Sequence, residues 1–102
     1  MPLIYPKVTA ERIAKGGHDC LCCPVVLAVA AELPAGRKVL VYAHEIYIDG
    51  RPYPTPVRVE RFVRAFDAPV RDAADPDLAP FAFVLWVEES AMEPVKVYEE
   101  AA

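Results

Sequence analysis

The 102-residue chain contains no asparagine, no glutamine, a single serine (Ser90) and two threonines. Without side-chain amides it cannot make the bidentate Asn or Gln contact by which many proteins read adenine. A serine nucleophile would have to be Ser90, which lies in an acidic segment that we expect to be exposed. The formal net charge of −4 also argues against general nucleic-acid binding, because that activity needs a positive surface. The residues from which hydrolytic or base-reading sites are usually built are therefore scarce.

Long hydrophobic runs are scarce as well. The longest, residues 21–31, is much shorter than the ~20 apolar residues that a membrane-spanning helix requires, so we expect no membrane association. The first residues lack the basic start and apolar region of a secretory signal, and three cysteines packed together do not form a disulfide framework. We therefore expect a cytoplasmic protein. The missing amides and the 11 prolines fit either a thermophilic source or a GC-rich genome.

The apolar fraction of 55% is above the usual ~45–50%, and it predicts one well-packed domain over residues 1–102. Helices are expected at residues 10–15, 24–33 and 56–67, with Thr9 as the cap of the first helix, Gly16-Gly17 at its end, and Cys23 and Pro24 as the cap and first residue of the second. Residues 71–79 are expected to form a polar loop. Strands are expected at residues 3–8, 37–42, 45–48, 51–53 and 81–87, with a short last strand at 95–98. The order β-α-α-β-β-β-α-β predicts an α+β fold, in which two or three helices pack on a mostly antiparallel sheet of four to five strands. The ordered core is expected to span residues 3–98, with 99–102 as a frayed tail.

Three local patterns carry most of this prediction. The dipeptide Asp49-Gly50 is typical of a two-residue hairpin turn, in which both positions need a positive φ. Residues Val59, Phe62, Val63 and Phe66 follow the spacing of one apolar helix face. The run 81–87 is apolar at every position, which favours a central strand covered on both sides by helices or by a partner chain. If Val84 and Trp86 are not covered by a helix, another chain is needed to cover them.

All three cysteines lie in one short cluster, which we consider as a tentative metal site for zinc formed by His18, Cys20, Cys22 and Cys23. Structural zinc sites normally use two separated ligand pairs, so a single cluster closes a tetrahedron poorly. The spacing Cys20-x-x-Cys23 at a helix start alternatively suggests thiol redox chemistry. A third alternative pairs Cys22 or Cys23 with His44 as nucleophile and base. The simple interpretation is that these small residues fill space around a buried helix start, with no cofactor.

Two further sets are candidates for ligand or partner binding. The arginines Arg58, Arg61 and Arg64 form a stripe along one helix face, where guanidinium groups are suited to phosphates or carboxylates. The aromatic residues Tyr47, Tyr53 and Trp86 are of the types that anchor protein interfaces. The ordinary alternatives are a solvated helix face and cross-strand packing, respectively.

Four short stretches resemble a group of small uncharacterised proteins found in bacteriophages and high-GC bacteria. They are Cys23–Ala28, Ile48–Pro54, Arg61–Asp67 and Pro80–Phe83, in this order over roughly residues 5–88. The resemblance implies one compact fold in a phage or mobile-element setting, where small acidic domains often bind and block host components. It supplies no activity.

The leading hypothesis is a non-enzymatic binding module that docks onto a host protein, as an inhibitor or anti-defence factor does, and that forms a homodimer. One alternative is a binder of a phosphate-bearing ligand such as a nucleotide, held by Arg58, Arg61 and Arg64. Another is a metal or thiol protein that uses the cluster from His18 to Cys23.

Overall fold

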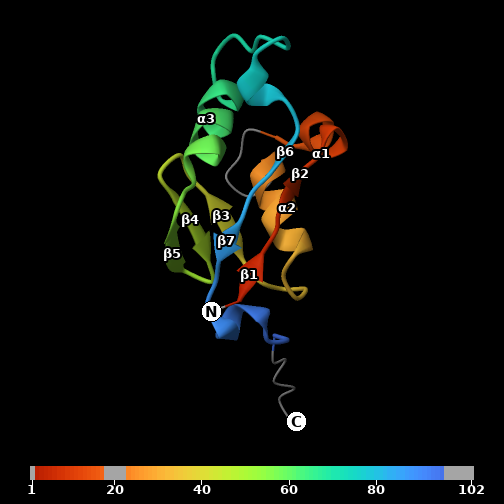
Figure 1. Ribbon diagram of the computed structural model, residues 1–102. Helices are drawn as coiled ribbons and strands as arrows, with labels where there is room; N and C mark the ends of the chain where they lie inside the picture. The colour runs from red at the N-terminus through yellow and green to blue at the C-terminus, as the bar shows by residue number, and fades with distance from the viewer. Residues whose placement is uncertain (1, 18–22, 96–102) are drawn as a thin grey trace, which may run out of the picture.

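The structure, a computed structural model, describes residues 2–17 and 23–95. The chain forms a single α+β domain, as the sequence predicts (Figure 1). The strands, however, do not form one sheet. They make two two-stranded sheets and one three-stranded sheet, all antiparallel. The tail 99–102 and part of the expected last strand lie outside the described residues, and Val95 is not in a strand.

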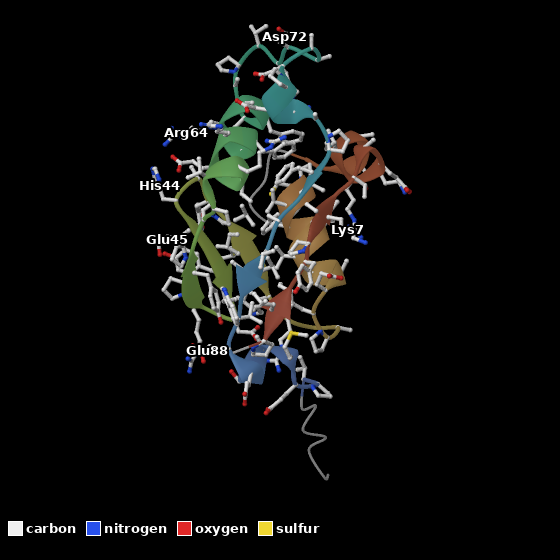
Figure 2. All side chains as sticks on the ribbon, in the orientation of Figure 1. Lys7, His44, Glu45, Arg64, Asp72 and Glu88 are labelled. Atoms are coloured by element: carbon white, nitrogen blue, oxygen red, sulfur yellow. The ribbon has the colours of Figure 1, made fainter. Side chains whose placement is uncertain are left out.

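The two small sheets are halves of one antiparallel ribbon. Strand β1 (Leu3–Ile4) pairs with β7 (Leu85–Trp86), and β2 (Lys7–Val8) pairs with β6 (Phe81–Ala82), in the same register. Between the halves the Phe83 N–H donates to the Pro6 carbonyl at 3.1 Å, but Pro6 has no N–H to return the bond. The missing donor explains why regular pairing is interrupted there. Lys7 lies towards one end of this ribbon and Glu88 just beyond the other (Figure 2).

Strands β3 (Val39–Val41), β4 (Glu45–Ile48) and β5 (Arg51–Pro54) form the three-stranded sheet. The turn between β4 and β5 is the predicted Asp49-Gly50 turn, with φ values of 51° and 81°. The side chain of Asp49 also ties the turn to the start of β3, because it accepts the Lys38 N–H at 3.0 Å and pairs with Arg37 at 2.8 Å. The Lys38 hydrogen bond, followed by the Arg37 guanidinium, lowers the pKa of Asp49.

The first two helices have the predicted capping residues. The hydroxyl of Thr9 accepts the Arg12 N–H at the start of α1 (Ala10–Lys15), which ends at Gly16. Helix α2 (Pro24–Ala31) has Cys23 at its cap position and Pro24 as its first residue. Most of α2 is buried, as its continuous apolar sequence predicts, although its last two residues, Ala30 and Ala31, are exposed.

Helix α3 (Val57–Phe66) buries the predicted face of Val59, Phe62, Val63 and Phe66. A short 3₁₀ helix, η1 (Pro76–Leu78), follows in the loop that was expected to be irregular, and Asp75 caps it. A second 3₁₀ helix, η2 (Glu89–Met92), follows the ribbon and was not predicted.

One hydrophobic core lies between the inner face of the ribbon and the inner face of the three-stranded sheet. Ile4, Phe83 and Leu85 of the ribbon belong to the same buried cluster as Ile46 and Ile48 of the sheet. Helix α2 packs against β2 and β3, so it closes one side of this arrangement. The two outer faces therefore point away from each other.

The prediction for residues 81–87 is half correct. Phe83, Leu85 and Val87 are buried, but Val84 is 49% exposed and Trp86 is 55% exposed. Within the single chain no helix of the described residues covers this outer face. Nor does any helix of the described part have the length and apolarity needed to cross a membrane.

Candidate functional site

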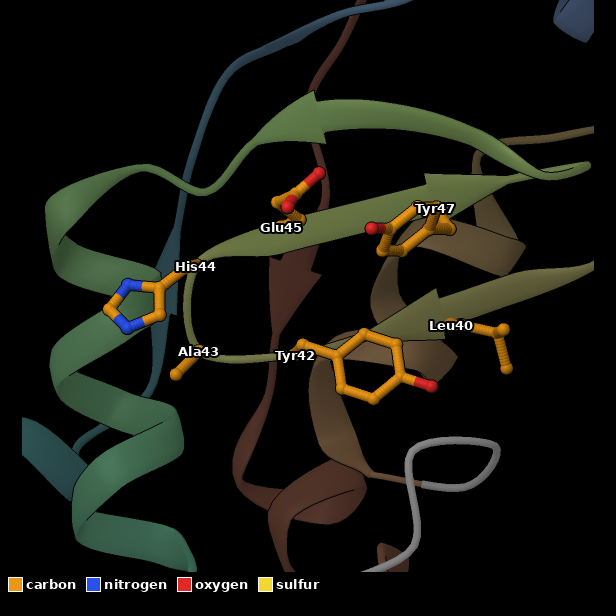
Figure 3. A pocket seen from close by; sticks show the side chains of 6 residues that line it. All are labelled: Leu40, Tyr42, Ala43, His44, Glu45 and Tyr47. Atoms are coloured by element: carbon orange, nitrogen blue, oxygen red, sulfur yellow. The ribbon is translucent and has the colours of Figure 1, made fainter.

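The outer face of β3 and β4 carries an open hollow of about 460 Å³ (Figure 3). It is lined by Leu40, Tyr42, Ala43, His44, Glu45 and Tyr47. We call Leu40, Tyr42, Glu45 and Tyr47 the tyrosine face, because the two phenol rings dominate it.

Strand alternation builds this face. Val39, Val41 and Ile46 point inward to the core, so Leu40 and Tyr47, which pair directly across the two strands, point outward. The ring of Tyr42 meets the ring of Tyr47 edge to face, with centroids 5.8 Å apart and planes at 89°. This is a favourable arrangement of two aromatic rings, and it holds the hollow open between them and Leu40.

A carboxylate lies beside the two phenols. A hydrogen bond with Glu45, followed by desolvation and by the negative charge of the same carboxylate, raises the pKa of Tyr47. The phenol is protonated at neutral pH, as it would be with its ordinary pKa, and it serves as a hydrogen-bond donor. The hollow thus offers apolar walls together with a donor and an acceptor at its mouth (Figure 3).

His44 forms the rim towards α3. Its Nδ1 lies 3.6 Å from a Glu60 carboxylate oxygen, and its Nε2 lies 3.3 Å from an Arg64 nitrogen. Arg64 is itself paired with Glu60 at 3.0 Å. The imidazole side chain is 72% exposed. Among the described residues that line the hollow, none carries a thiol or an aliphatic hydroxyl. The expected pairing of His44 with Cys22 or Cys23 finds no support here, because Cys23 is buried and Cys22 is outside the described residues.

A second groove of about 700 Å³ continues from the tyrosine face between α2 and β3. It shares Leu40 and Tyr47 with the hollow, and Val26, Leu27 and Ala30 of α2 form its opposite wall. Its lining is largely aliphatic. The two depressions together form one apolar surface that begins on the sheet and runs along the helix.

The structure separates the three arginines predicted to hold a phosphate. The guanidinium of Arg58 donates to the carbonyls of Asp77 (2.8 Å) and Ala79 (3.0 Å) and lies 4.1 Å above the Phe81 ring. Arg58 therefore links α3 to η1, and its guanidinium does not lie in solvent beside those of Arg61 and Arg64. Arg64 is paired with Glu60, and Arg61 is exposed on the helix surface.

The structure brings two of the three predicted aromatic residues together and places the third elsewhere. Tyr47 lines the hollow, whereas Tyr53 and Trp86 line a separate open depression between the end of β5 and the ribbon. Tyr53 is buried there, and its hydroxyl accepts the Glu88 N–H at 3.1 Å, while Trp86 is half exposed on the outer face of the ribbon.

The cysteine cluster is mostly outside the described residues. His18, Cys20 and Cys22 fall there, and Cys23 is buried at the start of α2. Across residues 2–17 and 23–95, no group of three or more His, Cys, Asp or Glu side chains is placed to hold a metal ion.

The sequence suggested His44 as a base for Cys22 or Cys23, and it did not single out Tyr42 from the other aromatic residues. The common site of Tyr42 and His44 depends on the register of β3 against β4, for which the short segment between the strands gives no turn signal. Comparisons of the chain with protein-family models, with curated proteins and with solved structures find no match.

Proposed function

We propose that the chain is a protein-binding module that docks a partner protein on its tyrosine face. The observation that carries the proposal is the hollow between Tyr42, Tyr47 and Leu40, which continues into the groove beside α2. Tyrosine is enriched among the residues that dominate binding energy at protein interfaces. The rings are held by their mutual contact, so little conformational freedom is lost when a partner binds.

The shape of the hollow favours a protein over a small molecule. A small-ligand pocket typically buries about 70–90% of its ligand, whereas this hollow lies open on the sheet. The alternative of a nucleotide held by three arginines is less well supported, because Arg58 is committed to backbone carbonyls and Arg64 to Glu60.

Charge indicates the kind of partner. The chain carries a net charge of −4, and the exposed carboxylate of Glu45 lies within the tyrosine face. A partner with an apolar anchor residue and a basic residue beside it would be complementary to this arrangement. The phage setting implied by the sequence resemblance makes a host protein the partner that we propose.

The test compares three forms of the purified chain as bait in lysate from a high-GC bacterial host. They are the wild type, the double variant Tyr42→Ser/Tyr47→Ser, and the control Val70→Ser, which alters an apolar residue that is 85% exposed outside the hollow. A captured protein is identified, purified and titrated against each form by calorimetry.

We expect saturable one-to-one binding that the double variant weakens by about 30-fold or more, as loss of interface anchors does. Val70→Ser should bind like the wild type. Equal affinity for the wild type and the double variant, or a lysate from which no saturable partner can be purified, contradicts the proposal.

A further inference from the structure

The outer face of the ribbon carries three large apolar side chains that are each about half exposed. Tyr5 is 54% exposed, Val84 49% and Trp86 55%. Extending the register of the two strand pairs places Tyr5 opposite Val84, between the pairs Leu3–Trp86 and Lys7–Ala82. Contiguous exposed apolar side chains on a small protein commonly mark an interaction surface.

Backbone hydrogen bonding brings these side chains close together. The N–H groups of Phe83 and Val87 donate across the ribbon, to Pro6 and Pro2 respectively. Residues with even numbers on the second strand, such as Val84, therefore stand in the pairs that are not hydrogen-bonded. In such pairs the two Cα atoms are only about 4.5 Å apart, and the side chains pack together. Tyr5 and Val84 thus form the centre of one continuous patch.

Both the size and the charge of the outward side chains change from one end of the patch to the other. Along the second strand the outward side chains increase in size from Ala82 through Val84 to Trp86. Lys7 lies at the small end, beside Ala82, and Glu88 lies beyond the large end (Figure 2). If a second copy faced this surface with its strands reversed in direction, its large side chains would lie over the small ones of the first copy. The lysine of each copy would then lie near the glutamate of the other.

We propose that a second copy of the chain covers this face, related by a two-fold axis that lies in the interface and runs across the strands. This operation stacks Trp86 on Ala82 of the second copy and brings Tyr5 and Val84 near their own equivalents. Lys7 then approaches the ring of Trp86 and the carboxylate of Glu88 on the other chain, where cation–π and charge attraction are both available. An axis along the strands would instead place both copies of Lys7 at one end of the interface and both copies of Trp86 at the other.

The exposed area sets the strength of this dimer. A buried aromatic side chain contributes about 150–250 Å² of contact area, so two half-exposed rings and a valine leave roughly 200–300 Å² per chain to be covered. Stable interfaces cover about 800 Å² per partner. The dimer is therefore weak and concentration-dependent, with a dissociation constant on the order of 10–100 μM.

The tyrosine face points away from the ribbon, so the dimer does not depend on the proposed function and leaves that face open. The double variant Tyr42→Ser/Tyr47→Ser should consequently dimerise like the wild type. This result separates failure of one proposal from failure of the other.

Analytical ultracentrifugation over a range of protein concentrations tests the dimer. The mass of the wild type should rise from monomer to dimer, and Trp86→Ser should raise the dissociation constant at least about tenfold. Circular dichroism should show that Trp86→Ser keeps the fold, because the side chain is half exposed. Val70→Ser should change neither property.

A charge exchange tests the direction of the axis. Lys7→Glu and Glu88→Lys should each weaken the dimer, because each places like charges against each other at both ends of the interface. An equal mixture of these two variants should dimerise again, because both ends then carry opposite charges. Monomeric wild type at about 1 mM, well above the expected dissociation constant, contradicts the proposal. A dimer indifferent to Trp86→Ser, or a mixture no better than the single variants, contradicts it as well.

Discussion

Substitution of Gly16 by alanine tests the close approach between the end of α1 and the start of α2. A Cβ atom at Gly16 would lie 2.5 Å from Cδ, 2.6 Å from Cγ and 2.8 Å from the backbone nitrogen of Pro24. Pro24 is the buried first residue of α2, and Gly16 ends α1. Neither the ring nor the helix start is a flexible chain end that can move aside, so Gly16→Ala must displace α1 from α2.

The magnitude follows from two opposing effects. Overpacking of this kind typically costs about 1–3 kcal/mol. The backbone of Gly16, with φ −70° and ψ 147°, is acceptable for alanine, and loss of glycine freedom from the unfolded chain returns about 0.4–1 kcal/mol. We expect a net loss of about 1–2 kcal/mol in the free energy of unfolding, and each kcal/mol lowers Tm by about 4–8 °C in a domain of this size.

Urea and thermal unfolding, followed by circular dichroism, measure this loss. In a double-mutant cycle, Gly16→Ala should cost less in a Pro24→Ala background, because the two ring carbons are then absent. Gly50→Ala is the matched control: it strains a residue with φ 81° in open space and should show no coupling to Pro24. A Gly16→Ala protein as stable as the wild type, or an equal cost in both backgrounds, would refute the steric argument.

Three further predictions concern individual side chains. The folded-state pKa of Asp49 lies below its unfolded value of about 3.8, so the stability that its charge provides is complete above that value and is lost as pH falls through the folded pKa. Asp49→Asn should therefore flatten the acid side of a plot of Tm against pH, and an unchanged slope would assign the effect to another group. Arg58→Lys should cost about 1–2 kcal/mol in urea unfolding because the forked contacts and the ring stacking are lost, whereas Arg61→Lys on the exposed surface should change stability by less than about 0.5 kcal/mol. Glu45→Gln should lower the pKa of Tyr47 towards its ordinary value in an alkaline absorbance titration, and an identical titration curve would show that Glu45 is not the cause.

The parts of the fold that were predicted correctly depend on local chemistry. The Thr9 cap, the Asp49-Gly50 turn and the buried face of α3 each follow from a few neighbouring residues. The division into three sheets was not predicted, because it depends on where Pro6 meets the opposite strand. For residues 81–87 the sequence left open whether helices of the same chain or a partner chain cover the outer face. An apolar run indicates that its side chains are buried. It does not indicate whether the same chain or another chain buries them.

The candidate site was less accessible to sequence analysis. Tyr47 was selected, but its neighbours in the hollow are brought to it by the pairing of β3 with β4. Arg58 was considered as a phosphate- or carboxylate-binding residue or as part of a solvated helix face, whereas its partners are carbonyl groups about 20 residues further along the chain. Contacts over such separations depend on the path of the loop, for which the sequence contains no periodic signal.

The outer edge of β5 limits how copies of this protein can associate. The hydrogen bond from the Thr55 N–H to the His44 carbonyl fixes which groups of β5 point towards β4, and it leaves Pro52 and Pro54 facing the open edge. Neither proline has an N–H to offer, so that edge presents only acceptors and cannot template an added strand. Growth of the three-stranded sheet from molecule to molecule is blocked on this side. Any strand added to this sheet by another molecule must therefore pair with the outer edge of β3.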